Sequence, residues 1–367
     1  MGCATAWELA RRGVRVALLD RGAVSGGSTG LGEGNVLCSD KEPGPELALA
    51  TAGLALYDEL EARFGASAGI RRKGALVVHA DEASLAAEPQ RLARLRAAGV
   101  ECSPVTPDEA RRLEPQLRAE IAGASWFPRD LQCAPRAIAR GLAGEAERLG
   151  ATVATGVEVA SIAMRGGRIA GVETASGPLG ADAVVLAAGA WSAALADTAG
   201  LELPLEPRKG QLLRLERRPE LLRRKLIDGG YMATVASPGA DLQVSTVVET
   251  TLDGHVLVGS SRERRGFDLT VDPVVSERLL RHAERIVPAV RGLRVDGAWA
   301  GLRPWLPGGL PAIGTTAAAD GLWIATGHEG AGVAHGPITG RLLAQAICGE
   351  PAALDLRPFD PDRFSRG

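Results

Sequence analysis

Residues 1–22, MGCATAWELARRGVRVALLDRG, indicate the fold more clearly than any other stretch of the chain. Their pattern predicts a helix over residues 3–12 that ends at Gly13, where glycine accepts the left-handed backbone of a helix end. Residues 14–20, VRVALLD, are then largely apolar, as expected of a buried parallel strand. A helix, a parallel strand and an acid, Asp20, are typical of a dinucleotide-binding unit, in which that acid accepts hydrogen bonds from ribose.

Gly2 matches the third glycine of the G-x-G-x-x-G turn in such a unit. It stands 18 positions before Asp20 (20 − 2), and a glycine there lets the helix pack closely against the strand. We expect the first strand of the unit and its first two glycines, which would precede Gly2, to be missing. The alternative for Asp20 is an ordinary turn residue after a strand, but its spacing from Gly2, with the helix and the strand between them, favours the ribose role.

Composition and charge exclude several classes of function. The 367 residues carry a formal net charge of −2, which argues against nucleic acid or an anionic membrane as the main partner. No run of about 18 apolar residues is present, so no transmembrane segment is expected. The five cysteines are scattered and never spaced C-x-x-C, which favours a cytoplasmic protein with reduced thiols. Because the histidines are also unclustered, no metal site is expected.

Strands of parallel type at the start, middle and end of the chain enclose antiparallel material. The apolar strands AVVLAAG and LWIATG resemble residues 14–20, whereas residues 205–270 predict several antiparallel strands. Further helices are predicted over residues 46–64, 83–98, 107–113, 273–287 and 337–347, the last with Pro337 near its first position. We therefore expect an α/β fold with a Rossmann-like nucleotide-binding domain from residues 1–75, 140–204 and 295–350, an antiparallel β-sheet substrate domain from residues 76–139 and 205–294, and a tail over residues 351–367.

A glycine-rich loop, SGGSTGLGEGN, covers residues 25–35 directly after the predicted ribose acid. Free N–H groups and small side chains in such a loop form an anion-binding nest suited to phosphate. Composition alone would also allow a surface loop without a ligand, but the position after Asp20 favours the phosphate role.

With these motifs the chain resembles the D-amino-acid oxidase superfamily of FAD enzymes, which includes glycine oxidase and sarcosine oxidase. The matching stretches occur in the family's order over nearly the whole chain: GCATAWELARRGVRVALLDRG, GSTG, GVEVASIAMRGGRIAGVETASG, AVVLAAGAWS, RKGQLL, GLRPWLPGGLPAIG and GLWIATGHEGAGVAHGPITGRLLAQAICG. The segment DGHVLVGSSRERRGFD, together with GHEGAG, is more similar to the flavin subunits of L-proline dehydrogenase, hydroxyproline dehydrogenase, opine oxidase and hydrogen cyanide synthase. Those flavin subunits pass electrons to a partner rather than to oxygen.

The resemblance implies FAD as the cofactor and assigns residues to it. Asp20 would hold the adenosine ribose, and Val159 would meet the adenine through its backbone. The residues implied to approach the pyrophosphate and flavin are Gly27, Ser28, Thr29, Gly30, Ala188 and Gly189. Those implied to face the flavin N1–C2=O edge, where charge accumulates on reduction, are Gly330, Gly332 and Val333; a helix that begins there would favour that negative charge. The GLRPWLPGG stretch lacks the cysteine that links flavin in sarcosine oxidases, so we expect non-covalent FAD.

Three residues are candidates for catalysis. Arg303 in GLRPW has the guanidinium fork that binds a carboxylate with two hydrogen bonds, as the matching arginine does in the family's amino-acid oxidases. His328 would shape the flavin edge or move a proton, and Glu329 would contact a substrate amine. The alternative for Arg303 is a structural arginine that packs beside Pro304. The alternative for His328 and Glu329 is that they are ordinary loop residues whose side chains hydrogen-bond to backbone groups. Glycine oxidase-like members carry a substrate-binding tyrosine where the alignment puts Val247, and Tyr231 is only a distant replacement.

These features predict an FAD-dependent oxidation of the C–N bond of an amino or imino acid of the proline, hydroxyproline, glycine or D-amino acid type, by hydride transfer from Cα to flavin N5. The expected partners are a small amino-acid substrate and an electron-accepting subunit. The alternative is a truncated flavoprotein-like subunit that binds no FAD and has a structural role, which the missing first strand suggests. NAD in place of FAD is disfavoured, because the C-terminal motifs resemble those that face a flavin.

Overall fold

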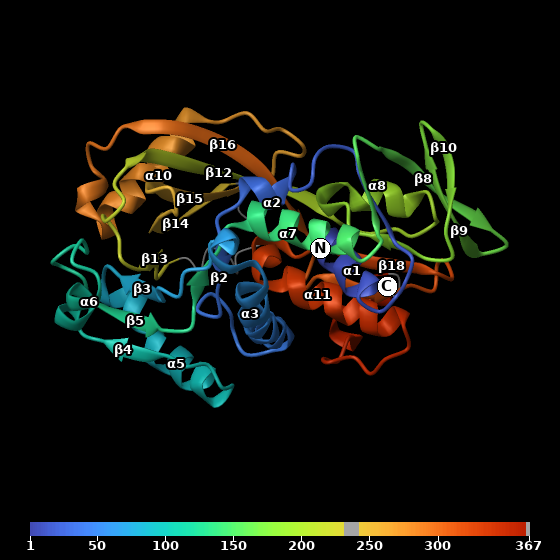
Figure 1. Cartoon of the computed structure of the whole chain (residues 1–367). Coiled ribbons are helices and arrows are strands. Elements are labelled where there is room, and N and C mark those ends of the chain that lie inside the picture. Colours follow the sequence, from blue (N-terminus) through green and yellow to red (C-terminus); the bar gives the residue numbers. More distant parts are fainter. Residues whose placement is uncertain (231–241, 365–367) are drawn as a thin grey trace.

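The computed structural model describes residues 1–230 and 242–364 (Figure 1). Its α-helices are α1 (Gly2–Ala10), α2 (Ser28–Leu31), α3 (Pro45–Phe64), α4 (Glu82–Leu85), α5 (Glu88–Ala97), α6 (Pro107–Leu113), α7 (Pro135–Arg148), α8 (Ser192–Asp197), α10 (Pro273–Ile286) and α11 (Gly332–Ile347). Its strands are β1 (Ala17–Asp20), β2 (Asn35–Val36), β3 (Ala75–His79), β4 (Ser103–Val105), β5 (Gly123–Phe127), β6 (Leu131–Gln132), β7 (Thr152–Thr155), β8 (Val159–Arg165), β9 (Arg168–Thr174), β10 (Gly177–Gly180), β11 (Val184–Leu186), β12 (Glu206–Arg217), β13 (Lys225–Asp228), β14 (Leu242–Thr250), β15 (His255–Glu263), β16 (Val295–Trp305), β17 (Ala312–Thr315) and β18 (Leu322–Thr326).

The parallel strands expected of a nucleotide-binding domain are present in two small sheets. β1 pairs in parallel with β7, and β11 pairs in parallel with β18, which also carries antiparallel β17. Helices α1 and α11 pack against each other beside these strands, and β8, β9 and β10 form a separate antiparallel sheet at the right of the view (Figure 1). The predicted α/β class is confirmed. Whether a further strand belongs to this region stays a prediction.

An eight-stranded mixed sheet occupies the other side of the molecule, in the order β16-β12-β15-β14-β13-β3-β5-β4 (Figure 1). Only the β13–β3 pair within it is parallel. Helix α10 covers one face, where Leu213 and Leu215 of β12 share a hydrophobic cluster with Val275 and Leu279. Because side chains alternate along a strand, Arg208 and Gly210 of β12 face the opposite side, away from α10.

β16 pairs along its length with β12, so residues 295–305 hydrogen-bond to the eight-stranded sheet. The predicted domain division, which assigns residues 295–350 to the nucleotide-binding domain, remains a proposal. The predicted helix over 83–98 is two helices, α4 and α5.

Helix α11 begins at Gly332, so Pro337 lies inside the helix and not near its first position. A proline there removes the N–H that would bond the carbonyl four residues earlier. The hydroxyl of Tyr57 in α3 donates to that carbonyl, on Val333, at 2.8 Å and replaces the missing donor. The tertiary contact therefore permits the helix to start a full turn before the proline.

No helix within residues 1–230 and 242–364 combines the length and the apolar character that a membrane crossing requires.

Candidate active site

The carboxyl ends of β11 and β18 bring a predicted cofactor-binding segment and two predicted catalytic residues together. Ala188 and Gly189 follow β11, and His328 and Glu329 follow β18. The hydroxyl of Thr326 donates to the carbonyl of Gly189 at 3.0 Å, which fixes one segment against the other. In open α/β sheets, ligands bind outside the carboxyl ends of parallel strands. This edge is therefore where a nucleotide cofactor fits.

Gly2 lies against β1 and against the residue that follows β11, where a small side chain is needed for close packing. A Cβ built on Gly2 would stand 3.2 Å from Leu18 Cδ1 and 3.7 Å from Ala187 Cβ. The N-terminus of α1 therefore sits close to both β1 and the end of β11, and a larger side chain would push the helix away.

Asp20 stands at the end of β1 beside the segment that leads to Val159. Its carboxylate accepts the backbone N–H of Gly22 at 2.8 Å, and its carbonyl accepts the N–H of Val157 at 3.0 Å. The neighbouring Arg21 lies over the ring of Trp191, 4.0 Å from its centroid. These contacts place the predicted adenosine-binding residues at one end of the nucleotide region. Their roles toward ribose and adenine remain proposals.

The glycine-rich loop crosses from the nucleotide region to the eight-stranded sheet. Ser28 donates from its hydroxyl to the carbonyl of Leu302 in β16, and α2 packs against that strand (Figure 1). A Cβ on Gly30 would stand 2.1 Å from the carbonyl oxygen of Ser25, so this turn accepts no side chain. The hydroxyl of Ser25 is buried and has no protein partner in the described residues. A tight turn with an unpartnered hydroxyl fits the phosphate groups of a dinucleotide.

Arg303 presents a fixed guanidinium next to this loop. Its Nη1 donates to the carbonyl of Ser261 at 2.9 Å, and its Nη2 donates to the hydroxyl of Ser260 at 2.8 Å. A Cβ on Gly210, in the neighbouring strand β12, would stand only 2.0 Å from that Nη1. The guanidinium therefore occupies the space that a side chain at position 210 would fill. Within the described residues, three of its five N–H donors remain for a ligand carboxylate.

Glu329 lies among arginines from three different strands. Its Oε1 is 3.2 Å from Nε of Arg262 and 3.6 Å from Nη1 of Arg208. Burial raises the pKa of the Glu329 carboxyl, but Arg262, Arg303 and Arg208 together lower that pKa to about 2. The backbone N–H of Gly330 also donates to the carboxylate. Glu329 is therefore an ionised hydrogen-bond acceptor at neutral pH.

The backbone of Glu329 is unusual, with φ of 45°. A non-glycine residue in this region costs about 1–3 kcal/mol and persists where the surroundings fix it. Such strain clusters at functional sites, which agrees with the predicted role of this loop.

His328 is buried, and its Nε2 lies 3.0 Å from the hydroxyl of Thr339. Burial, and secondarily the chain's N-terminal amine, lower the pKa of His328 to about 3. The imidazole is therefore neutral at physiological pH and is suited to shaping the site rather than to carrying a proton.

The loop that contains Gly330, Gly332 and Val333 leads directly into the N-terminus of α11. A Cβ on Gly330 would be 3.8 Å from both Nη2 of Arg262 and Nε of Arg303. The helix N-terminus and two guanidinium groups thus converge, and together they favour negative charge at this place.

Sequence reasoning missed several members of this cluster. Arg208 lies within the RKGQLL stretch that carried the family resemblance, yet nothing local distinguishes it from a surface arginine. Ser260 and Ser261 likewise gain a role only through strand pairing. Val247 is buried in an apolar cluster with Tyr57 and offers no group to a carboxylate. Tyr231 lies outside the described residues.

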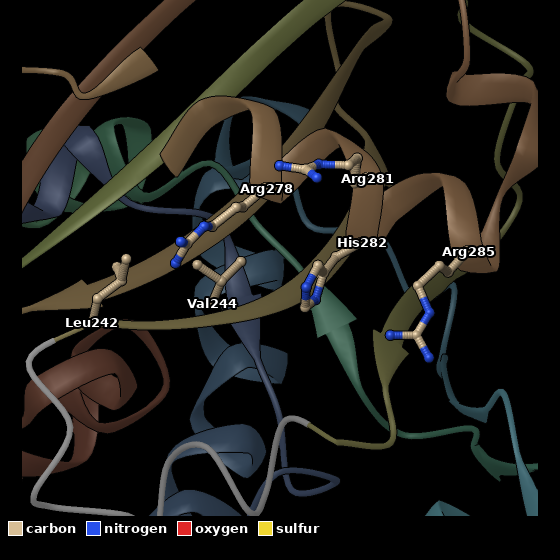
Figure 2. A pocket seen from close by; sticks show the side chains of 6 residues that line it. All are labelled: Leu242, Val244, Arg278, Arg281, His282 and Arg285. Carbon is tan, nitrogen blue, oxygen red and sulfur yellow. The ribbon is translucent and has the colours of Figure 1, made fainter. Parts of the chain in front are cut away.

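A cavity of about 590 Å³ lies elsewhere, on the face of the large sheet that α10 covers (Figure 2). Its lining residues are Leu242, Val244, Arg278, Arg281, His282 and Arg285. It has no part in the Arg303 cluster, because Arg303 faces the other side of the sheet together with Arg208. In the part of the chain that the structure describes, no group of histidine, cysteine or acidic side chains could hold a metal ion.

Comparison with known proteins identifies the family. The family model described as FAD dependent oxidoreductase (DAO) matches residues 1–346. The chain belongs to this family. The predicted family, its FAD cofactor and its oxidoreductase class are thereby confirmed.

Relatives in this family include glycine oxidases and a cyanide synthase subunit. Glycine oxidase of Geobacillus kaustophilus is 30% identical over 99% of this chain and 94% of its own length, and its crystal structure matches with 28% identity, 99% and 95% coverage and a TM-score of 0.88. Glycine oxidase of Pseudomonas putida is 37% identical over 53% of this chain and 50% of its own length, so the chain spans about half of that relative. Hydrogen cyanide synthase subunit HcnC of Pseudomonas aeruginosa is 34% identical over 70% of this chain and 58% of its own length.

Proposed function

We propose that this chain oxidises the C–N bond of an amino or imino acid with FAD, and that Arg303 binds the substrate carboxylate. The observation that carries the proposal is the Arg303 guanidinium, held by Ser260 and Ser261 next to the loop at Gly330. This fork is fixed before substrate arrives, so little ordering remains for binding to accomplish. Glycine oxidases among the relatives act on a substrate with the same carboxylate.

FAD, when bound, supplies the acceptor for the hydride that leaves the substrate Cα as the amine becomes an imine and loses a proton. Asp20, Gly2, Ser28, Gly30 and Gly189 are the residues proposed to hold this cofactor. Gly27, Thr29, Val159, Ala188, Gly330, Gly332 and Val333 complete the proposed set.

The protein's own contribution is position and charge. Arg303 fixes the carboxylate and thereby the direction of Cα–H. Glu329, ionised because of its arginine neighbours, is placed to accept a hydrogen bond from the substrate amine. The neutral His328 keeps the wall of the site uncharged. The N-terminus of α11, at Gly332 and Val333, stabilises negative charge nearby.

We further propose that FAD is held non-covalently and that electrons pass to a partner. The five cysteines are all free, and none lies in the GLRPWLPGG stretch. The name of the relative HcnC describes a subunit of a larger synthase, which supports an electron-accepting partner. A cytoplasmic location, proposed from the free thiols, is testable by cell fractionation.

The test is anaerobic titration of the purified yellow protein with proline, hydroxyproline, glycine and D-amino acids. We expect at least one of them to bleach the visible absorbance of the flavin. No bleaching with any amine-bearing acid contradicts the proposed activity, and a protein that stays colourless with added FAD contradicts cofactor binding. Turnover with oxygen against an artificial dye then separates an oxidase from a dehydrogenase.

A further inference from the structure

Two arginines on neighbouring strands are register partners on the face of the large sheet that points toward the site. Arg208 of β12 pairs in register with Arg303 of β16, and cross-strand partners of this kind place their Cβ atoms about 4.5–5.5 Å apart. Gly210, two residues along β12, has no side chain and leaves the space in which the Arg303 guanidinium lies. Both positive groups therefore reach the same part of the site.

Arg208 is buried and incompletely compensated. Arg208 is 6% exposed to solvent, and its guanidinium donates to the amide oxygen of Gln243 at 2.6 Å. Its carboxylate neighbour is Glu329 at 3.6 Å, but Glu329 lies closer to Arg262, at 3.2 Å. A buried charge that shares its counterion is costly unless another anion completes the pairing.

Among the residues that the structure describes, no carboxylate lies within ion-pair distance of Arg303. Its hydrogen bonds go to a carbonyl and a hydroxyl. Glu33 is within electrostatic reach of Arg303, but burial raises its pKa and one of its oxygens bonds Asn35 at 2.5 Å. One substrate carboxylate on Arg303 therefore compensates that arginine and leaves Arg208, within the described part of the chain, with a share of Glu329 as its counterion.

We propose that the substrate is a dicarboxylic amino or imino acid, with its α-carboxylate on Arg303 and its second carboxylate on Arg208. This inference rests on the proposed function and names the substrate class of that same site. Burial and the neighbouring arginines lower the pKa of Arg208, which agrees with a guanidinium that lacks a full counterion. A second carboxylate supplies it.

The test compares binding of two acids that lack an amine and cannot be oxidised. Isothermal calorimetry measures the dissociation constants of glutarate and butyrate for the purified protein. We expect glutarate to bind roughly tenfold more tightly, as one charge-assisted hydrogen bond supplies. In Arg208→Gln the ratio falls toward one, and in Arg208→Lys part of it returns. Arg278→Gln removes the same charge at the cavity behind α10 and leaves the ratio unchanged.

Equal binding of glutarate and butyrate, or a ratio that persists in Arg208→Gln, overturns the inference. Circular dichroism of each variant confirms that the comparison concerns folded protein. The flavin titration separates the two proposals. Bleaching by glycine or proline at concentrations at which aspartate, glutamate and iminodiacetate are inactive overturns the dicarboxylic class and leaves the amino-acid oxidoreductase intact. Bleaching by none of these acids overturns both.

Discussion

Replacing Glu329 by glutamine removes the negative charge shared by the arginines and should destabilise the protein strongly. In the folded chain those arginines lower the Glu329 pKa from 4.5 to about 2. A shift of roughly 2.5 units at about 1.4 kcal/mol per unit corresponds to about 3 kcal/mol of stability at pH 7. The side chain is only 15% exposed, so solvent screens the interaction little.

The pH dependence has a definite sign. Because the pKa is lower in the folded chain than in the unfolded one, the contribution is fully present above pH 4.5 and is lost as the pH falls through about 2. The same relation gives about 2 kcal/mol at pH 3.5. The difference in stability between the wild type and Glu329→Gln should therefore shrink with acid.

Urea denaturation followed by tryptophan fluorescence measures both values, since the chain has six tryptophans. The control is Glu277→Gln, which removes a carboxylate that is 67% exposed and 3.7 Å from Arg281. We expect this control to lie within about 0.5 kcal/mol of wild type. A Glu329→Gln protein as stable as the control at pH 7, or a loss that does not change with pH, refutes the assignment of an ionised, arginine-bound Glu329.

Three further predictions follow from the packing and from the free cysteines. Gly210→Ala should displace the Arg303 guanidinium, because the new Cβ would stand 2.0 Å from Nη1. The KM for substrate should then rise roughly tenfold while the fold is retained. An unchanged KM contradicts this prediction. Tyr57→Phe should cost about 1–2 kcal/mol by leaving the Val333 carbonyl without its donor. In the Pro337→Ala background, Tyr57→Phe should lower the free energy of unfolding by less, because residue 337 then has its own N–H to donate to the Val333 carbonyl. If urea denaturation shows that the losses from the two substitutions simply add, the explanation is wrong. Acid precipitation should release all yellow colour into the supernatant, and colour retained in the pellet means covalent flavin.

Local patterns predicted the elements because each has a local physical cause. Gly13, with φ of 74°, closes the turn that follows α1, and Thr106 caps α6 by accepting the N–H of Glu109. Strands β1, β11 and β18 are predictable because each is a short run of mainly apolar residues, as in a buried parallel strand. Pro337 misled the prediction of the start of α11, because the Tyr57 hydroxyl that compensates for it lies far away in sequence.

The site itself was predicted only in part, since its geometry comes from strand register. Arg303 and Glu329 were predicted from motifs, whereas Arg208 joins them only because β12 and β16 pair with Arg208 opposite Arg303. A shift of one residue would turn Arg208 to the face that α10 covers. No periodicity within a single segment reveals that alignment.

The most direct test of the account is anaerobic reduction of the flavin in the wild type and in Arg303→Gln. If Arg303 binds the substrate carboxylate, the wild-type flavin bleaches with an amino or imino acid, and the variant needs roughly a hundredfold more substrate to bleach equally. Identical concentration dependence in the two proteins contradicts the central claim.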